Sequence, residues 1–262
     1  MKKYWVVFAK SLKSEITYRS AALAGIVSSL MSFAIQICLW KALLGAGVKN
    51  GTSFSDMLLF VVINSFLGAL TRANVASTIE NAMVDGSVSM EIIRPMSYKY
   101  YLLASILGKN FYSALTGTLP ILFVSFFFIS PTSLPGPANA ALFALSAVLG
   151  ILLMFELTYV VGLLAFWIQR CWFLSWYLRG FQTIFGGTMV PLWFYPEWLK
   201  TASYFLPFRY FTFEPINFFL GRTPLQSAWI PLLAALMWLL GLGLLGQLMW
   251  KAAVRRLSVN GG

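Results

Sequence analysis

Long apolar runs separated by short polar connections dominate the pattern of the chain. The first run carries no charged residue from Ala21 to Trp40, and five further runs follow it. A helix needs about 20 apolar residues to cross the hydrocarbon core of a bilayer. We therefore predict an all-α integral membrane protein, one domain over residues 1–262, with six transmembrane helices. These spans are predicted at about residues 21–44, 57–75, 110–130, 139–168, 174–194 and 228–250.

The first 19 residues have a different, amphipathic pattern. Basic residues alternate with apolar ones, and the apolar ones follow helical spacing: Tyr4, Val7, Phe8, Leu12 and Ile16. This pattern predicts a helix lying in the membrane interface over residues 1–19. The alternative is a plain basic flank of the first span. Residues 98–108 resemble a second interfacial helix that leads into the third span.

Composition supports the membrane assignment and excludes several kinds of chemistry. The chain is 59% hydrophobic and 10% charged, whereas soluble domains carry about 25% charged residues. It has no histidine and two cysteines, so zinc, haem and His-based catalysis have little support. Cys38 and Cys171 are predicted near opposite membrane surfaces, so we expect no disulfide between them.

The net charge of +11 is explained by the orientation of the chain in the membrane rather than by nucleic-acid binding. Most of the 19 Lys and Arg residues fall in segments that are cytoplasmic if the N-terminus lies inside. Because cytoplasmic loops are enriched in Lys and Arg, both termini are predicted to be cytoplasmic. The sequence has no Walker A, HExxH or GxSxG motif, and its few acidic residues lie mostly in loops. We therefore expect no enzymatic activity, no metal site and no ATP site on this chain.

The segment from residue 85 to residue 97, called the 85–97 segment below, is the first candidate site. An Asp-Gly turn opens it, and the proline of its Arg-Pro pair disfavours helix at the preceding residue. A short element with an apolar tip on the cytoplasmic side suits docking to a soluble partner. The alternative is an ordinary cytoplasmic turn. The candidate residues are Asp85, Gly86, Met90, Glu91, Ile92, Arg94 and Pro95.

The aromatic and proline-rich stretch that begins at the end of the fifth predicted span, called the 186–222 segment below, is the second candidate site. Paired glycines and a proline loosen the end of the span, and aromatic residues of this kind favour the membrane interface. We expect short re-entrant helices here; the alternative is a loop with an aromatic belt. The candidate residues are Gly186, Gly187, Pro191, Pro196, Trp198, Pro207 and Phe208.

Polar residues inside predicted spans are candidates for a transport pathway. Glu156 is the one carboxylate deep in a span, where ionisable residues are costly and usually face a polar interior. It either lines the pathway, favouring cationic substrates, or forms a structural ion pair with Arg179 or Arg72. Asn64 and Gln182 are weaker candidates, because polar residues in spans often only bond one helix to another.

In order and placement, these features resemble the ABC-2 type transporter permease family, the membrane subunits of ABC exporters. The resemblance rests on Asp85-Gly86 followed by Arg94-Pro95, and on Gly186-Gly187 with the Val-Pro-Leu, Pro-Glu-Trp-Leu and Leu-Pro-Phe-Arg-Tyr motifs after it. It is closest to a branch formerly catalogued as a domain of unknown function and related to drug-resistance permeases.

The resemblance implies roles for both segments and a set of partners. The 85–97 segment would hold the coupling helix that meets a separate ATPase, and residues 195–222 would gate the exit. Two ATPase copies would bind ATP and Mg²⁺, and a second permease, identical or a sister subunit, would complete the pathway. An amphipathic or lipid-like substrate (drug, lipid, glycan or peptide) would leave through a bacterial inner membrane. The alternatives are an ion-gradient-driven secondary transporter and a membrane scaffold.

Overall fold

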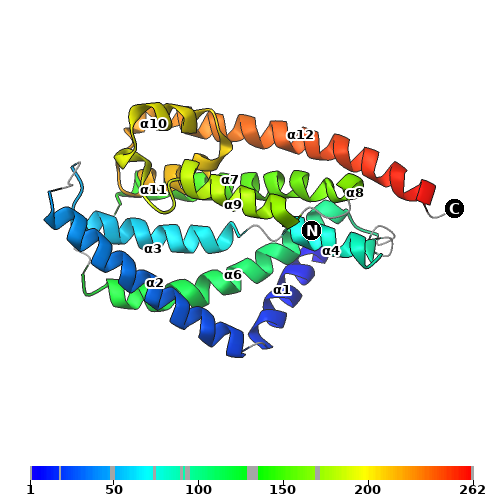
Figure 1. Cartoon of the computed structure of the whole chain (residues 1–262), viewed down its shortest axis with the longest axis horizontal. Helices are drawn as coiled ribbons and strands as arrows, with labels where there is room; N and C mark the ends of the chain where they lie inside the picture. The colour runs from blue at the N-terminus through cyan, green and yellow to red at the C-terminus, as the bar shows by residue number, and fades with distance from the viewer. Residues whose placement is uncertain are drawn as a thin grey trace.

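The helical prediction is confirmed wherever the structure describes the chain. The computed structural model describes residues 2–17, 19–47, 51–72, 75–88, 91, 95–128, 135–168 and 172–260. Every regular element in these ranges is a helix (Figure 1). This is expected in lipid, because a helix satisfies its backbone hydrogen bonds within one segment.

The α-helices follow one another from α1 to α12, with short 3-10 helices in the 186–222 segment and after it. They are α1 (Lys2–Thr17), α2 (Arg19–Gly45), α3 (Phe54–Leu70), α4 (Val75–Val84), α6 (Tyr98–Ser125), α7 (Pro137–Leu163), α8 (Ala165–Ile168), α9 (Trp172–Phe185), η2 (Leu192–Phe194), α10 (Glu197–Tyr204), η3 (Pro207–Tyr210), α11 (Phe213–Phe219), η4 (Leu225–Ser227) and α12 (Trp229–Asn260).

Four stretches of the described chain are long and apolar enough to cross a membrane. They are Ala22–Gly45, Phe54–Val84, Pro137–Ile168 and Leu225–Arg255, and the second covers α3 and α4 and includes residues 73–74, which lie outside the described ranges. The first has a mean hydropathy of 2.0, yet only 6% of its apolar window is buried inside the protein. A water-soluble protein rarely exposes apolar surface on this scale, so the exposure indicates a helix that faces lipid or another membrane subunit.

The other two predicted spans correspond to α6 and α9, and for them spanning stays a prediction. Helix α6 has 28 residues but carries Lys99 and Lys109. It begins at Tyr98, so residues 98–108 are continuous with it rather than forming a separate helix. Helix α9 ends at Phe185 after 14 residues, about 21 Å at 1.5 Å per residue. That length falls short of the roughly 30 Å hydrocarbon core.

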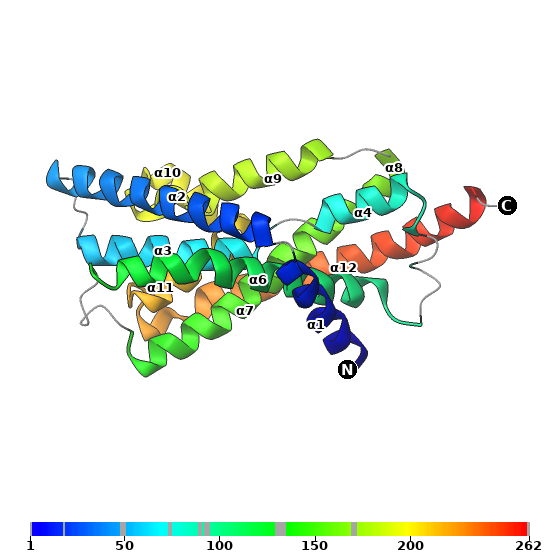
Figure 2. The same cartoon turned by 90° about the horizontal axis from the view of Figure 1, so that it is seen from below.

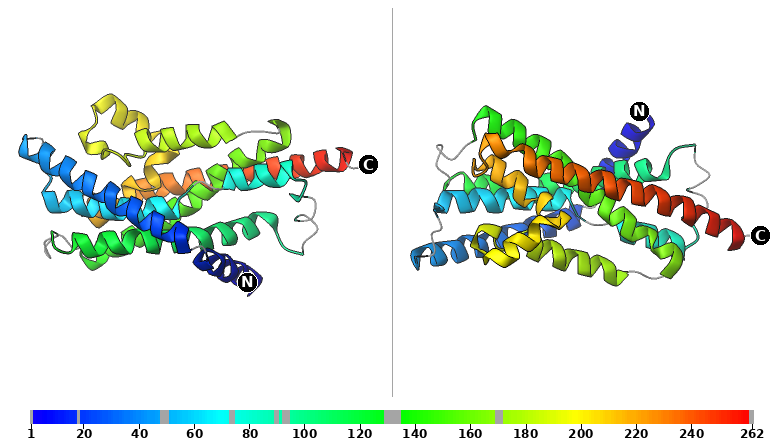
Figure 3. Two further views of the ribbon diagram at one scale, coloured as in Figure 1. Left: turned by 60° about the horizontal axis from the view of Figure 1, so that its bottom comes forward. Right: turned by 90° about the horizontal axis from the view of Figure 1, so that it is seen from above.

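The molecule has two distinct ends joined by long helices. Helices α10 and α11 lie at one end, whereas α4, α8 and the end of α12 lie at the other (Figure 1). Helix α12 runs along almost the whole length between them (Figure 3). A buried cluster beside α10 and α11 contains Phe60 and Ile216, and a second, at the opposite end, contains Tyr98, Tyr159 and Ala253.

Helix α1 departs from the direction of the other helices and crosses α6 (Figure 2). The crossing is close because α6 has a glycine there: a Cβ at Gly108 would lie 2.5 Å from the backbone oxygen of Phe8. Beside it, the hydroxyls of Ser11 and Ser105 lie 3.1 Å apart and share a hydrogen bond. The predicted N-terminal helix is present, and α6 holds it in place.

Replacing Gly108 with alanine should disturb this crossing. We expect Gly108→Ala to lower the free energy of unfolding by about 1–3 kcal/mol, as overpacking in a close contact does. Thermal unfolding in a mild detergent measures the change. Gly117→Ala is the matched control, because Gly117 lies on the same helix with nothing within 4 Å of its added Cβ. Equal stability of the two variants would contradict the packing described here.

Candidate functional site

The 85–97 segment begins with a tight turn directly after α4. Gly86 adopts a φ of +74°, a left-handed conformation that favours glycine. The backbone N–H of Ser87 donates to Asp85 Oδ1 at 2.9 Å, and hydrogen bonds from Ser87 lower the pKa of the Asp85 carboxyl. Three predicted contact residues, Met90, Ile92 and Arg94, lie outside the described residues.

Contacts at its ends attach this segment to the rest of the protein. Val88 is 2% exposed and packs in the buried cluster at this end of the molecule. Lys3 Nζ donates to the backbone oxygen of Pro95 at 3.3 Å, and the Ser97 N–H donates to the Tyr4 hydroxyl at 3.3 Å. Helix α1 is therefore bound to the same segment that the sequence marks for docking.

Two neighbouring residues at the start of α6 connect the 85–97 segment to the core. The Tyr98 ring stacks on Trp250 of α12 with centroids 5.0 Å apart. Burial, and then the nearby Glu91 carboxylate, raise the pKa of Tyr98. Lys99 Nζ lies 2.6 Å from Glu156 Oε1 of α7, with side chains 16% and 12% exposed. The segment is thus joined to both α7 and α12.

This ion pair identifies the partner of Glu156. The sequence suggested Arg179 or Arg72 for a structural pair, but the structure pairs Glu156 with Lys99. Lys99 lies outside the predicted spans, because it precedes the third apolar run. The helix begins earlier than that run, and this places Lys99 beside α7. A single carboxylate inside a membrane span indicates that a cationic side chain lies at the same depth. It does not indicate which cationic residue that is.

A polar cavity of about 690 Å³ lies among α2, α3 and α6. Asn64 is one of its lining residues, whereas Glu156 and Gln182 are not. Asn64 also donates from Nδ2 to the backbone oxygen of Thr188 at 2.8 Å, which links α3 to the 186–222 segment. Other polar lining residues are Ser28, Ser29, Ser32, Arg72 and Thr116.

The 186–222 segment folds into short helices, three of which start with a proline at or next to their first residue. Pro191, Pro196 and Pro207 stand at the beginnings of η2, α10 and η3. Gly187, with a φ of +62°, turns the chain after α9. Phe208 is buried at 7% exposure, whereas Trp198 is 71% exposed. The short helices are present; their re-entry into a bilayer stays a prediction.

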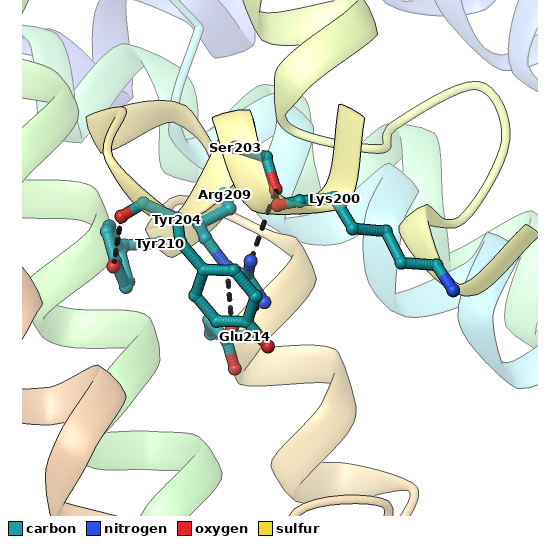
Figure 4. A network of polar contacts seen from close by, with 6 residues as sticks. All are labelled: Lys200, Ser203, Tyr204, Arg209, Tyr210 and Glu214. Carbon is teal, nitrogen blue, oxygen red and sulfur yellow. Dashed lines mark hydrogen bonds and ion pairs between the residues drawn. The ribbon is translucent and has the colours of Figure 1, made fainter. Parts of the chain in front are cut away.

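A buried polar network holds these short helices together (Figure 4). Arg209 Nε donates to Glu214 Oε1 at 2.7 Å, and Arg209 Nη1 donates to Ser203 Oγ at 3.1 Å. The Arg209 and Glu214 side chains are only 5% and 6% exposed, and the guanidinium carbon lies 3.5 Å from the Tyr204 ring centre. Tyr210 donates from its hydroxyl to the Tyr204 backbone oxygen at 3.0 Å.

Neither Arg209 nor Glu214 was predicted as a site residue. The available signal was two opposite charges five positions apart within an otherwise apolar, aromatic stretch. Such charges are expensive to bury unless they pair. The network fixes α10, η3 and α11 relative to one another, so this segment is an ordered part of the fold.

Comparison with known families decides which group of proteins the chain belongs to. A family model described as ABC-2 family transporter protein matches residues 30–261. The chain belongs to the ABC-2 transporter family. No curated protein matches it. Membership confirms the resemblance drawn from the sequence, supports a permease role in membrane transport, and implies association with an ABC ATPase.

Breaking the Lys99–Glu156 pair should destabilise this ABC-2 protein. Lys99→Met leaves a mostly buried carboxylate unpaired, which we expect to cost about 3 kcal/mol of unfolding free energy. Exchanging the charges, Lys99→Glu with Glu156→Lys, should recover part of the loss. Thermal unfolding checks both, with Lys109→Met as the matched control because Lys109 is exposed on the same helix. A Lys99→Met protein as stable as the control would show that the pair contributes little.

Arg209 should not tolerate lysine. A single ammonium group cannot reproduce the fork that bonds Glu214 and Ser203 while stacking on Tyr204. We expect Arg209→Lys to lose about 1–3 kcal/mol of stability, because buried partners lose hydrogen bonds. For comparison, Lys200→Met removes a pair with Glu197, which is 86% exposed, and should change stability by less than about 1 kcal/mol. If Arg209→Lys melted at the same temperature as the wild type, the network would not contribute the stability expected of it.

Proposed function

We propose that the chain is the permease subunit of an ATP-driven ABC exporter. It crosses a bacterial inner membrane six times with both termini in the cytoplasm. Together with a second permease, identical or a sister subunit, it moves an amphipathic or lipid-like substrate outward. Two copies of a separate ATPase bind and hydrolyse ATP with Mg²⁺, and this chain performs no covalent chemistry.

The observation that carries the proposal is the family match over residues 30–261. The contacts around the 85–97 segment support the location of ATPase coupling. The segment lies where Tyr98 and Lys99 connect it to Trp250 and Glu156, on two different helices. A docking element with these contacts transmits a displacement from a soluble partner to α7 and α12. A loop without such contacts does not.

The polar cavity among α2, α3 and α6 supports a pathway at the interface with the second permease. Hydroxyl and amide side chains, including Ser29, Asn64 and Thr116, line about 690 Å³ of space. Surfaces that face lipid are apolar, so polar groups gathered at the depth of the spans indicate contact with water, substrate or another subunit. We assign this cavity to the pathway and the 186–222 segment to its outer gate.

Co-purification tests the proposal. The chain is extracted from its native membrane in a mild detergent, and the proteins that co-purify with it are identified. We expect an ATPase with a Walker A motif beside the wild-type chain, and its loss from Arg94→Glu and Glu91→Lys. The matched controls are Lys200→Glu and Glu197→Lys, which make comparable charge reversals at the opposite end and should keep the ATPase.

Thermal unfolding of each variant separates a lost docking contact from a misfolded chain. Loss of the ATPase from a variant that melts like the wild type places coupling at the 85–97 segment. Recovery of intact wild-type complexes without any ATPase would overturn the exporter proposal and favour a transporter driven by an ion gradient.

A further inference from the structure

A second cavity, of about 570 Å³, lies beside the Arg209 network between the 186–222 segment and the start of α12. One part of its wall is apolar and includes Trp193, Phe213, Ile230 and Pro231. Another part is polar and includes Asn217 and Arg222. This two-sided lining differs from that of the polar cavity among α2, α3 and α6, and it suits a molecule with a polar head and an apolar body.

Arg222 is the least neutralised cation of this wall. The other two are bound to close carboxylates: Arg209 donates to Glu214 at 2.7 Å and Lys200 to Glu197 at 2.7 Å. The Lys200 side chain also extends away from the Arg209–Glu214 pair (Figure 4).

By contrast, Arg222 Nη2 lies 4.0 Å from Asp56 Oδ2, beyond hydrogen-bonding distance. The same Asp56 oxygen already accepts from the Ser53 N–H at 3.1 Å. The Arg222 guanidinium lies 4.3 Å from the Trp193 ring centre, and burial lowers its pKa. The Arg222 charge is therefore partly withdrawn from water, with only the distant Asp56 carboxylate to offset it.

Asn217, which lines the same cavity, adds an unpaired acceptor. Its side chain is 9% exposed, and its Oδ1 is buried with no hydrogen-bond partner. Leaving a buried acceptor unpaired costs about 1–3 kcal/mol. The backbone oxygen of Asn217 accepts a hydrogen bond from the Arg222 N–H at 2.9 Å. This bond fixes the backbones of the two residues relative to each other. A ligand that donates a hydrogen bond here would remove this cost.

We propose that this cavity binds an amphipathic molecule whose head group carries a phosphate and a hydroxyl. The phosphate pairs with Arg222, the hydroxyl donates to Asn217 Oδ1, and the apolar body lies along Trp193, Ile230 and Pro231. The proposed function places this end of the protein, and therefore the cavity, at the outer leaflet of the membrane. The binding chemistry stands on the cavity itself.

A lipid fits these observations better than a small free anion with the same head group. Asp56 competes for Arg222, so a free head group has to displace this carboxylate without burying apolar surface in return. A lipid also buries apolar surface against the wall, which adds about 25 cal/mol per Å². Large apolar side chains are exposed nearby, including Trp229 at 59% and Phe205 at 76%, as expected where this end meets a bilayer.

Ligand-dependent melting of the purified chain tests the site. The probes are dihexanoyl phosphatidylglycerol, dihexanoyl phosphatidylcholine and glycerol phosphate, each titrated below micelle-forming concentrations. We expect phosphatidylglycerol to raise the melting temperature most. Arg222→Gln should weaken its apparent affinity about tenfold or more, because hydrogen bonds to charged groups contribute about 1.5–3 kcal/mol. Arg179→Gln, an exposed arginine on α9 outside the cavity, is the matched control and should bind normally.

Asn217→Leu keeps the experiment decisive if Arg222→Gln folds poorly. It replaces an amide that has an unpaired oxygen by a side chain of similar size, and it should weaken phosphatidylglycerol binding severalfold. Equal shifts with phosphatidylcholine, or unchanged binding by both variants, would overturn the proposal. A shift with glycerol phosphate as large as with the lipid would replace it by a small-anion site. None of these results depends on whether an ATPase co-purifies.

Discussion

Pairing of buried charge is the constraint on which both ends of this molecule depend. A charge withdrawn from water is tolerated only beside an opposite charge and further polar partners. Lys99 meets Glu156 where α6 and α7 approach each other. At the other end, Arg209 meets Glu214 and Ser203 and so orders a run of short helices. Each ion pair therefore fixes the relative position of the helices that carry it.

Helix α7 joins these two ends. Glu156 attaches it to Lys99, next to the residues that contact the 85–97 segment. Less than two turns earlier on the same helix, a Cβ at Gly150 would lie 2.6 Å from the backbone oxygen of Tyr210. Under the proposed function, a displacement of the 85–97 segment by an ATPase passes through Lys99 to α7. The close contact at Gly150 then carries it to η3 and the outer gate.

The pattern of hydrophobic and polar residues predicted the helices. It did not predict which charged residues pair between them. Uninterrupted apolar runs indicated the long helices, and Asp85-Gly86 indicated a turn because glycine accepts a positive φ. The Lys99–Glu156 pair was missed because hydropathy starts the third span after Lys99, although the helix starts at Tyr98. Likewise, the pairing of Arg209 with Glu214 was missed because the two residues meet only when the short helices bring them together. The spacing of hydrophobic residues along the sequence does not indicate ion pairs of this kind.

If an ATPase docks at the 85–97 segment, the two ends of the molecule lie on opposite sides of the membrane, and cysteine labelling tests this. Single cysteines at Ser87 and Glu197, in a chain with Cys38→Ser and Cys171→Ser, are treated in intact cells with a membrane-impermeant maleimide. We expect labelling of Glu197→Cys in intact cells and of Ser87→Cys only after permeabilisation. Labelling of both from one side, or of Ser87→Cys from outside, would contradict this expectation, because a cytoplasmic ATPase then has no access to the 85–97 segment.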